Sequence, residues 1–271
     1  MKEQIKQIID ETANKLHKRS RVREYCQARI LQFLQENGLF RSWIFHGGTA
    51  LRFLYRLPRY SEDLDFALKS SKTAKNFSEI IKRVTKAFEA ETYSIDAKLN
   101  DKRVVKTAFI RFPGLLHEFD LSPHKSEALS IKIEVDSNPP AGGITETSVI
   151  RRYVILNIQH YDKASLLSGK LHAILARPYV KGRDLYDLFW YLSDSSWPEP
   201  NIKFLNKALL QTNWKGPEIT ESNWNSLIAE KLKSINWEEA VKDTHPFIEK
   251  ASDIKLLTKE NIIDTLKRRK L

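Results

Sequence analysis

Apolar positions recur along the chain with two different periods, and their order predicts the layout of the fold. Residues 1–39 have the spacing of two helices. A short apolar run at 43–45 leads through two glycines into a helical pattern over 49–57. Over 63–68, apolar and acidic residues alternate, which is the period of a strand with one buried face. The pattern therefore predicts two helices followed by strand, glycine turn, helix and strand.

The middle of the chain is predicted to be mostly sheet, and the remainder helical. A helical pattern over 73–92 comes first, and β-type stretches follow at 93–99, 103–112, 129–136 and 149–158. Helical patterns then cover 162–176, 183–193, 201–211, 222–233 and 257–269. We expect mixed α and β structure in a domain of residues 1–160 and an all-helical domain of residues 161–271. One compact unit is the alternative, because no low-complexity linker separates the two parts.

Composition excludes several classes of protein. The 271 residues are 41% hydrophobic and 29% charged, values typical of a globular protein. Cys26 is the only cysteine, so a disulfide framework within the chain and a thiolate metal cluster are both excluded. No stretch approaches the roughly 18 apolar residues of a membrane span, and the first residues do not resemble a secretion signal. We therefore expect a cytoplasmic protein without a membrane partner.

The chain has a net charge of +11, which makes a polyanion a plausible partner. Five basic residues and no acid lie between Lys15 and Arg23, and four more form the run Lys267–Lys270. A solvated helix face is the alternative interpretation of such runs.

Two acidic residues on one predicted strand are candidate metal ligands. Asp63 and Asp65 project to the same face, with Cα atoms roughly 6.6 Å apart. Paired carboxylates can hold magnesium together with phosphate oxygens, as phosphoryl transfer requires. The DxD pattern also occurs in glycosyltransferases, and an exposed strand face remains the alternative.

A glycine turn precedes this strand in the chain. Gly47, Gly48 and Thr49 follow a short apolar strand and open a helix. Glycines allow close approach of the backbone, the free amides of a helix N-terminus attract phosphate, and the Thr49 hydroxyl offers another phosphate contact. Alternatively, Thr49 is the N-cap of an ordinary helix. Together with Asp63 and Asp65, the turn predicts a phosphate cradle beside a metal site.

A third carboxylate is expected from the strand at 131–136. Its isoleucines and valine take one face, and Glu134 and Asp136 take the other. Either acid completes a three-carboxylate site if this strand lies beside the one that carries Asp63. An ion pair with a basic neighbour is the competing interpretation.

The helical half adds one lysine and two acids. Lys170 lies beside the apolar stripe of its helix, where a surface position is the alternative. Asp184 and Asp187 share a face of the next helix, where acids in the first turn also act as caps.

Four segments, taken in order, resemble the AbiEii-type nucleotidyltransferase toxins. They are His46-Gly-Gly-Thr-Ala-Leu51, Arg59-Tyr-Ser-Glu-Asp-Leu-Asp-Phe66, Lys170-Leu-His-Ala173 and Arg183-Asp-Leu-Tyr-Asp-Leu188. The resemblance covers about residues 42 to 193. It implies an α+β fold, with a polymerase-β-like nucleotidyltransferase core that contains a short mixed sheet, followed by a helical half.

The resemblance also implies roles for individual residues. Gly48 and Thr49 match the glycine-serine pair that holds the triphosphate, and Gly47 precedes them. Asp63 and Asp65 match the metal ligands, and Lys170 matches the lysine at the nucleotide. Asp187, with Asp184 next, matches the active-site acid of the second domain, and Glu134, with Asp136 in reserve, stands for the third carboxylate.

The implied function is transfer of a nucleoside monophosphate from an NTP, with Mg2+ or Mn2+, to an acceptor. The 3′ end of tRNA is the expected acceptor, and the basic charge fits RNA. A protein acceptor such as the antitoxin, or an inactive module that binds RNA or a partner, is the alternative. A cognate antitoxin is the expected protein partner, and DNA is not expected.

Overall fold

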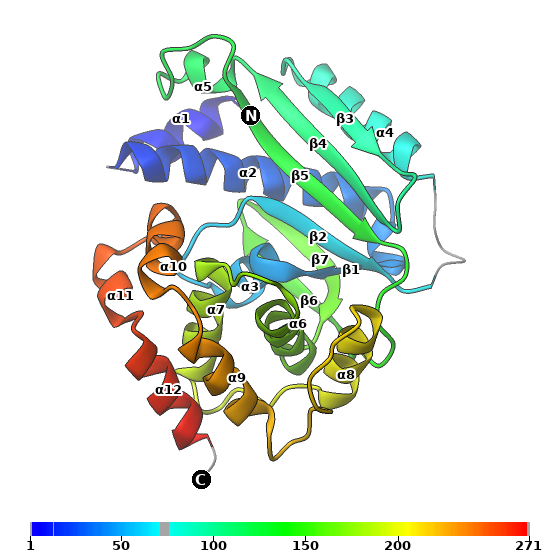
Figure 1. Cartoon of the computed structure of the whole chain (residues 1–271). Coiled ribbons are helices and arrows are strands. Elements are labelled where there is room, and N and C mark those ends of the chain that lie inside the picture. The colour runs from blue at the N-terminus through cyan, green and yellow to red at the C-terminus, as the bar shows by residue number, and fades with distance from the viewer. Residues whose placement is uncertain (1, 13, 71–75, 270–271) are drawn as a thin grey trace. The chain divides into compact units, whose positions relative to one another are not determined.

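The fold is taken from a computed structural model, which describes residues 2–12, 14–70 and 76–269 (Figure 1). Residues 73–75 of the predicted helix at 73–92, and Lys270 of the basic run, lie outside the described residues.

The chain divides into two compact units. The first consists of Met1–Arg56, Tyr60–Pro139 and Thr147–His160, and the second of Leu57–Arg59, Pro140–Glu146 and Tyr161–Leu271. Two short segments from the first 160 residues therefore pack with the second unit.

The first unit contains a seven-stranded sheet in the order β3-β4-β5-β2-β1-β7-β6. The strands are β1 (Trp43–His46), β2 (Asp63–Leu68), β3 (Asp96–Asn100), β4 (Val105–Pro113), β5 (Ala128–Asp136), β6 (Thr145–Arg152) and β7 (Val154–Tyr161). The β2–β5 and β1–β7 pairs are parallel, whereas β1–β2, β3–β4 and β4–β5 are antiparallel. The expected α+β class with a mixed sheet is thus confirmed.

The predicted β-type stretch at 149–158 is in fact two strands. Tyr153 separates β6 from β7, and its φ of 58° is left-handed. Because the apolar pattern continues through the break, the sequence alone shows one stretch where the backbone forms two neighbouring strands.

Helices of the first unit pack on the sheet and on one another. They are α1 (Lys2–Asp10), α2 (Lys15–Glu36), α3 (Gly47–Tyr55), α4 (Phe77–Ala90) and the short α5 (Leu115–Glu118). Along β5, Leu129, Ile131, Ile133 and Val135 are buried, and the residues between them are half-buried. α2 contacts β5, and α4 contacts β3 and β4, so these helices pack on that buried face (Figure 1).

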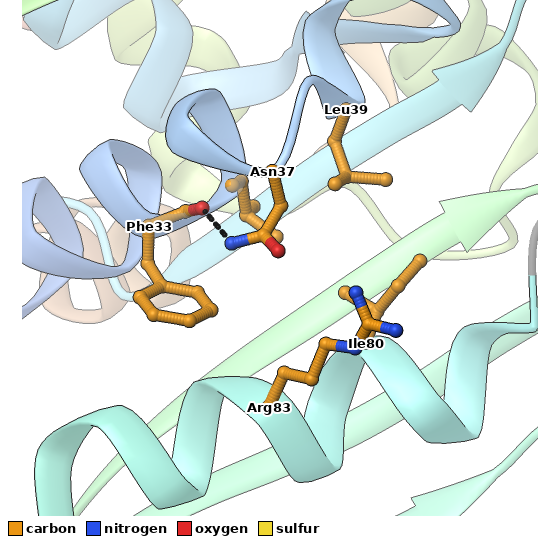
Figure 2. Close-up of a pocket in the computed structure, with 6 residues that line it drawn as sticks. Phe33, Asn37, Leu39, Ile80 and Arg83 are labelled. Atoms are coloured by element: carbon orange, nitrogen blue, oxygen red, sulfur yellow. Dashed lines mark hydrogen bonds between the residues drawn. The ribbon is translucent and has the colours of Figure 1, made fainter.

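A small pocket lies where α2 meets α4. It encloses about 50 Å³ and is lined mainly by apolar side chains, with Asn37 donating to the Phe33 carbonyl (Figure 2). Its charged residue, Arg83, forms an ion pair with Glu79 on its own helix. The pocket is therefore a packing gap between two helices.

The second unit is helical after β7. Its α-helices are α6 (Lys163–Ala176), α7 (Gly182–Leu192), α8 (Ile202–Gln211), α9 (Trp224–Lys233), α10 (Trp237–Thr244), α11 (Ala251–Leu256) and α12 (Lys259–Arg268). The sequence pattern misses α10 and α11. α10 buries only Ala240 and Thr244, and α11 buries none of its residues, so neither has the apolar stripe on which such a prediction depends.

Candidate active site

The predicted metal ligands share one face of β2. Asp63 and Asp65 are half-buried, and Leu64 and Phe66 between and after them are buried in the core. Burial and the neighbouring negative charge of Asp65 raise the pKa of Asp63 to about 6. Two carboxylates this close repel each other when both are ionised, so a bound cation would relieve their repulsion.

Gly47 brings the first turn of α3 against the same carboxylates. It has a φ of +78°, and a Cβ built on it would lie 2.2 Å from Oδ2 of Asp65. In the sheet, His46 on β1 lies opposite Asp65 on β2, so the glycine turn follows directly from that pairing. Only glycine fits here, since any side chain would displace the carboxylate.

Thr49 has a different role from the one the sequence predicts. Its side chain is fully buried, and its hydroxyl donates to the backbone carbonyl of Asp63. The hydroxyl therefore ties the first turn of α3 to β2 instead of facing a phosphate. Gly48 and Thr49 lie in the first turn of α3, where backbone N–H groups are the donors that could bind a phosphate.

A buried cluster of charges fixes α3. Arg52 on α3 forms an ion pair with Glu24 on α2, and the two side chains are 3% and 2% exposed. Arg152 donates to the same carboxylate at 2.7 Å, and Tyr153 donates its hydroxyl at 3.0 Å. Sequence reasoning missed this cluster, because no local pattern connects a glutamate on α2 to arginines on α3 and β6.

Strand register separates the two candidates for a third carboxylate. Glu134 on β5 pairs with Asp65 on the neighbouring β2, whereas Asp136 pairs with Ala67. Glu134 also forms an ion pair with Lys132 at 2.8 Å. Within the described ranges, no three His, Cys, Asp or Glu side chains are grouped closely enough to hold a metal by themselves. Asp63 and Asp65 instead suit a magnesium ion that takes one or two carboxylates and completes its shell with phosphate oxygens and water.

The other predicted residues meet in the second unit. Lys170 on α6 contacts Asp184 at 3.0 Å and Asp187 at 2.6 Å, both on α7. Burial by itself would lower the pKa of Lys170, but the two carboxylates together raise it above its usual value. Lys170 is thus a cation held by two acids, with its side chain 13% exposed, and it is not a solvent-facing surface lysine. Asp184 does lie in the first turn of α7, as the alternative interpretation expected.

Asp184 is held by a second cation. Burial opposes its ionisation, but the charges of Lys170 and Arg177 outweigh this effect and hold the pKa of Asp184 below its usual value. Lys181, not Asp184, is the N-cap residue of α7.

Asp187 is fully enclosed by Lys170 and Arg59. Arg59 donates two hydrogen bonds of 2.6 Å to the two carboxylate oxygens, and the side chain of Asp187 has no exposed surface. Asp187 therefore joins Arg59, which precedes β2, to Lys170 on α6 within the second unit. Arg59 begins one of the four family-like segments, but its partner is 128 residues away and no sequence spacing signals the pair.

A larger cavity lies at the start of α7, within the second unit. It encloses about 510 Å³ and is lined by Lys181, Arg183 and Lys231, with Glu239 and Asp243 among the other lining residues. The volume is that of an ordinary small-molecule pocket, and its charge is mixed.

Basic residues between Lys15 and Arg23 are largely engaged within the chain. Arg19 pairs with Glu127, Arg23 pairs with Glu62 at 3.1 Å, and Arg21 bonds to Tyr153. These arginines therefore hold α2 to other parts of the chain. Across the residues with described structure, no helix combines the length and apolar character needed to cross a membrane.

Comparison with known proteins gives a family and a fold. The family model described as nucleotidyl transferase AbiEii toxin, type IV toxin–antitoxin system, matches residues 29–257. No curated protein sequence matches the chain.

Several solved structures are similar in fold, and two of them illustrate the likeness. JHP933 from Helicobacter pylori is 18% identical with a TM-score of 0.56, and the match covers 93% of this chain and 91% of that one. MenT4, a nucleotidyltransferase toxin from Mycobacterium tuberculosis H37Rv, is 15% identical with a TM-score of 0.59, and the match covers 98% of this chain and 89% of that one. At these identities the likeness shows a common fold. The family match spans most of the sequence, and the chain therefore belongs to the AbiEii family of nucleotidyltransferase toxins of type IV toxin–antitoxin systems.

Proposed function

We propose that this toxin uses Mg2+, or Mn2+ in its place, to transfer a nucleoside monophosphate from an NTP to the 3′ end of tRNA. The observation that carries the proposal is the contact between the glycine turn and the paired acids. The Gly47 backbone lies against Asp65, so the amides at the start of α3 and the carboxylates of β2 meet at one place. A triphosphate needs both, since the amides bind its oxygens and metal ions bridge it to the acids.

In the proposed reaction, an acceptor hydroxyl oxygen attacks the α-phosphorus of the NTP. A bond forms between that oxygen and the phosphorus, and the bond from the phosphorus to the bridging oxygen of the β-phosphate breaks. The products are the nucleotidylated acceptor and pyrophosphate, and the hydroxyl proton passes to a carboxylate or to water. Bound divalent metal would lower the charge on the phosphates and on the attacking and leaving oxygens.

Each of the predicted site residues has a proposed part in that step. Asp63 and Asp65 hold the metal, and Glu134 is the third carboxylate because its strand register places it beside Asp65. The Gly47–Thr49 turn binds the β- and γ-phosphates through backbone amides. Lys170 offsets phosphate charge, and its carboxylate partners Asp184 and Asp187 position it.

The positive net charge of the chain supports an RNA acceptor. The net charge of +11 favours a polyanionic acceptor over a protein, and tRNA places the reaction in the cytoplasm. Membership in a toxin–antitoxin family implies an antitoxin partner. A protein acceptor and an inactive RNA-binding module are the alternatives that an experiment has to separate.

The test is incubation of the purified chain with each α-labelled NTP in turn, Mg2+ and total RNA. We expect label in RNA of tRNA size from the wild type, and none from the Asp63→Asn, Asp65→Asn double variant. Label on protein would overturn the RNA acceptor, and undiminished label with the double variant would overturn the metal site. Glu134→Gln should lower the rate much more than Asp136→Asn, because only Glu134 pairs with Asp65.

A further inference from the structure

One row of side chains crosses the first unit's sheet from the proposed metal site to the outer strand. Asp63 on β2 pairs with Lys132 on β5, Lys132 pairs with Phe109 on β4, and Phe109 pairs with Lys98 on β3. Partners in neighbouring strands share a face, so all four side chains lie on the face opposite the buried core residues. Figure 1 shows these strands side by side.

Phe109 is unusual in this row because it is an aromatic side chain on the solvent side of the sheet. It is 41% exposed, whereas its neighbours along the strand, Ala108 and Ile110, are fully buried. The Lys132 ammonium lies 6.0 Å from the centre of its ring. An exposed phenyl ring between two lysines combines a stacking surface with charges suited to phosphates.

The proposed binding of the triphosphate at the Gly47 turn leaves the β5 side of the metal site for the acceptor. In the sheet, β2 lies between β1 and β5, and β1 leads into the Gly47 turn that we propose binds the triphosphate. The attacking oxygen of an in-line displacement enters opposite the leaving pyrophosphate. With pyrophosphate on the side of α3, the acceptor enters over β5, and Phe109 lies on the next strand outward.

We propose that the exposed face of β5, β4 and β3 binds the single-stranded 3′ end of the acceptor RNA. The inference rests on the proposed function. Phe109 stacks on a base near the end of the strand, and Lys132 and Lys98 contact flanking phosphates. Phe109 lies two strands from Asp63, about 10 Å away, which is within the reach of the terminal nucleotides.

Single-stranded RNA fits this surface better than a protein does. Both cross-strand neighbours of Phe109 are lysines, and lysine is depleted in protein interfaces. A duplex hides the faces of its bases, whereas an unpaired end exposes them for stacking. Stacking on one ring tolerates any base, so we expect binding with little sequence preference.

The experiment measures RNA binding by the full chain without NTP or divalent cation, so that it does not depend on catalysis. The probe is a short fluorescent single-stranded oligoribonucleotide, followed by fluorescence anisotropy, with the same sequence as a duplex for comparison. Phe109→Ala should weaken binding of the single strand roughly tenfold or more. Phe109→Trp keeps an aromatic ring at this position and should bind about as tightly as the wild type. Val149→Ala is the control, because Val149 is 65% exposed on β6, at the opposite edge of the sheet from the proposed surface.

Salt dependence tests the lysines. Lys98→Gln should lower the slope of log affinity against log salt by about 0.7, the value for one phosphate of a single strand. Lys132→Gln should lower the slope by less, because Glu134 already pairs with Lys132 at 2.8 Å. Lys82→Gln, on the exposed side of α4, should leave the slope unchanged. In turnover, Phe109→Ala should raise KM for RNA and leave KM for NTP unaltered.

The outcomes separate this inference from the proposed function. Wild-type affinity in Phe109→Ala, an equal loss in Val149→Ala, or a raised KM for NTP alone would each overturn the RNA platform. If Phe109→Ala transfers label to RNA as well as the wild type does, the RNA platform is overturned and the proposed function stays intact. Phe109-dependent binding without any transfer would support the platform and contradict the proposed activity.

Discussion

The backbone of Gly47 and the carboxylate of Asp65 are so close that no side chain fits between them. A Cβ on Gly47 would lie 2.2 Å from Oδ2 of Asp65, and Gly47 has a φ of +78°. This contact joins the proposed phosphate-binding turn to the proposed metal ligand. In the proposed site, the separation of the Gly47 backbone from the Asp65 carboxylate therefore determines how far the bound phosphates lie from the metal.

Gly47→Ala should therefore lower the rate of nucleotidyl transfer by on the order of a hundredfold, because it displaces a reacting group by about 1 Å. The measurement is label transfer at saturating NTP. Gly38→Ala is the matched control, since Gly38 has a φ of +69° but a Cβ added to it would meet nothing within 4 Å. Both variants carry a backbone cost of roughly 1–2 kcal/mol, and only Gly47→Ala should lose activity. Equal activity of the two variants would contradict the role of the contact.

Thr49→Val separates a structural role of the hydroxyl from a phosphate contact. The Thr49 hydroxyl donates to the Asp63 carbonyl, so its loss leaves a buried acceptor without its partner and should cost about 1–3 kcal/mol. Urea unfolding measures that loss, and Thr49→Ser should show much less of it. If the hydroxyl instead binds phosphate, Thr49→Val will raise KM for NTP without any change in stability.

Arg59→Met should destabilise the second unit. Arg59 and Asp187 are 3% and 0% exposed, and removing one partner of so buried an ion pair costs about 3–5 kcal/mol. The comparison is Arg83→Met, whose ion pair with Glu79 is exposed and contributes about 0.5 kcal/mol. Urea unfolding of both variants measures the difference. A loss in Arg59→Met as small as that in Arg83→Met would show that the buried pair does not stabilise the fold.

The pKa of Asp184 predicts how stability depends on pH. Because its folded pKa is lower than usual, ionised Asp184 contributes stability that is complete above the unfolded pKa of about 3.9. That contribution is lost as the pH falls below this value towards the folded pKa. Asp184→Asn should therefore cost about 2 kcal/mol at neutral pH, and its difference from the wild type should shrink below about pH 4.

Unfolding free energies between neutral pH and about pH 3 test this prediction. Asp96→Asn serves as a control, because Asp96 pairs with Arg111 at an exposed position and should contribute little at any pH. A difference between Asp184→Asn and the wild type that grows in acid would contradict the assigned shift.

The sequence by itself determined the order of the elements and most of their bounds, because burial imposes a period of 2.0 or 3.6 on apolar residues. It also showed that Asp63 and Asp65 share a strand face and that a glycine turn precedes a helix. Prediction from apolar periodicity missed α10 and α11, because these helices bury few side chains or none. It also failed at Tyr153, where a positive φ divides one apolar stretch into two strands.

Only the tertiary structure decided which distant residues meet. Strand register distinguishes Glu134 from Asp136, and the fold brings Arg59 to Asp187 and Lys170 to both acids of α7. It also showed that the Thr49 hydroxyl bonds to the Asp63 carbonyl. Such contacts leave no periodic trace in one sequence, because a side chain's partner across a sheet or between helices depends on packing and register and not on spacing along the chain.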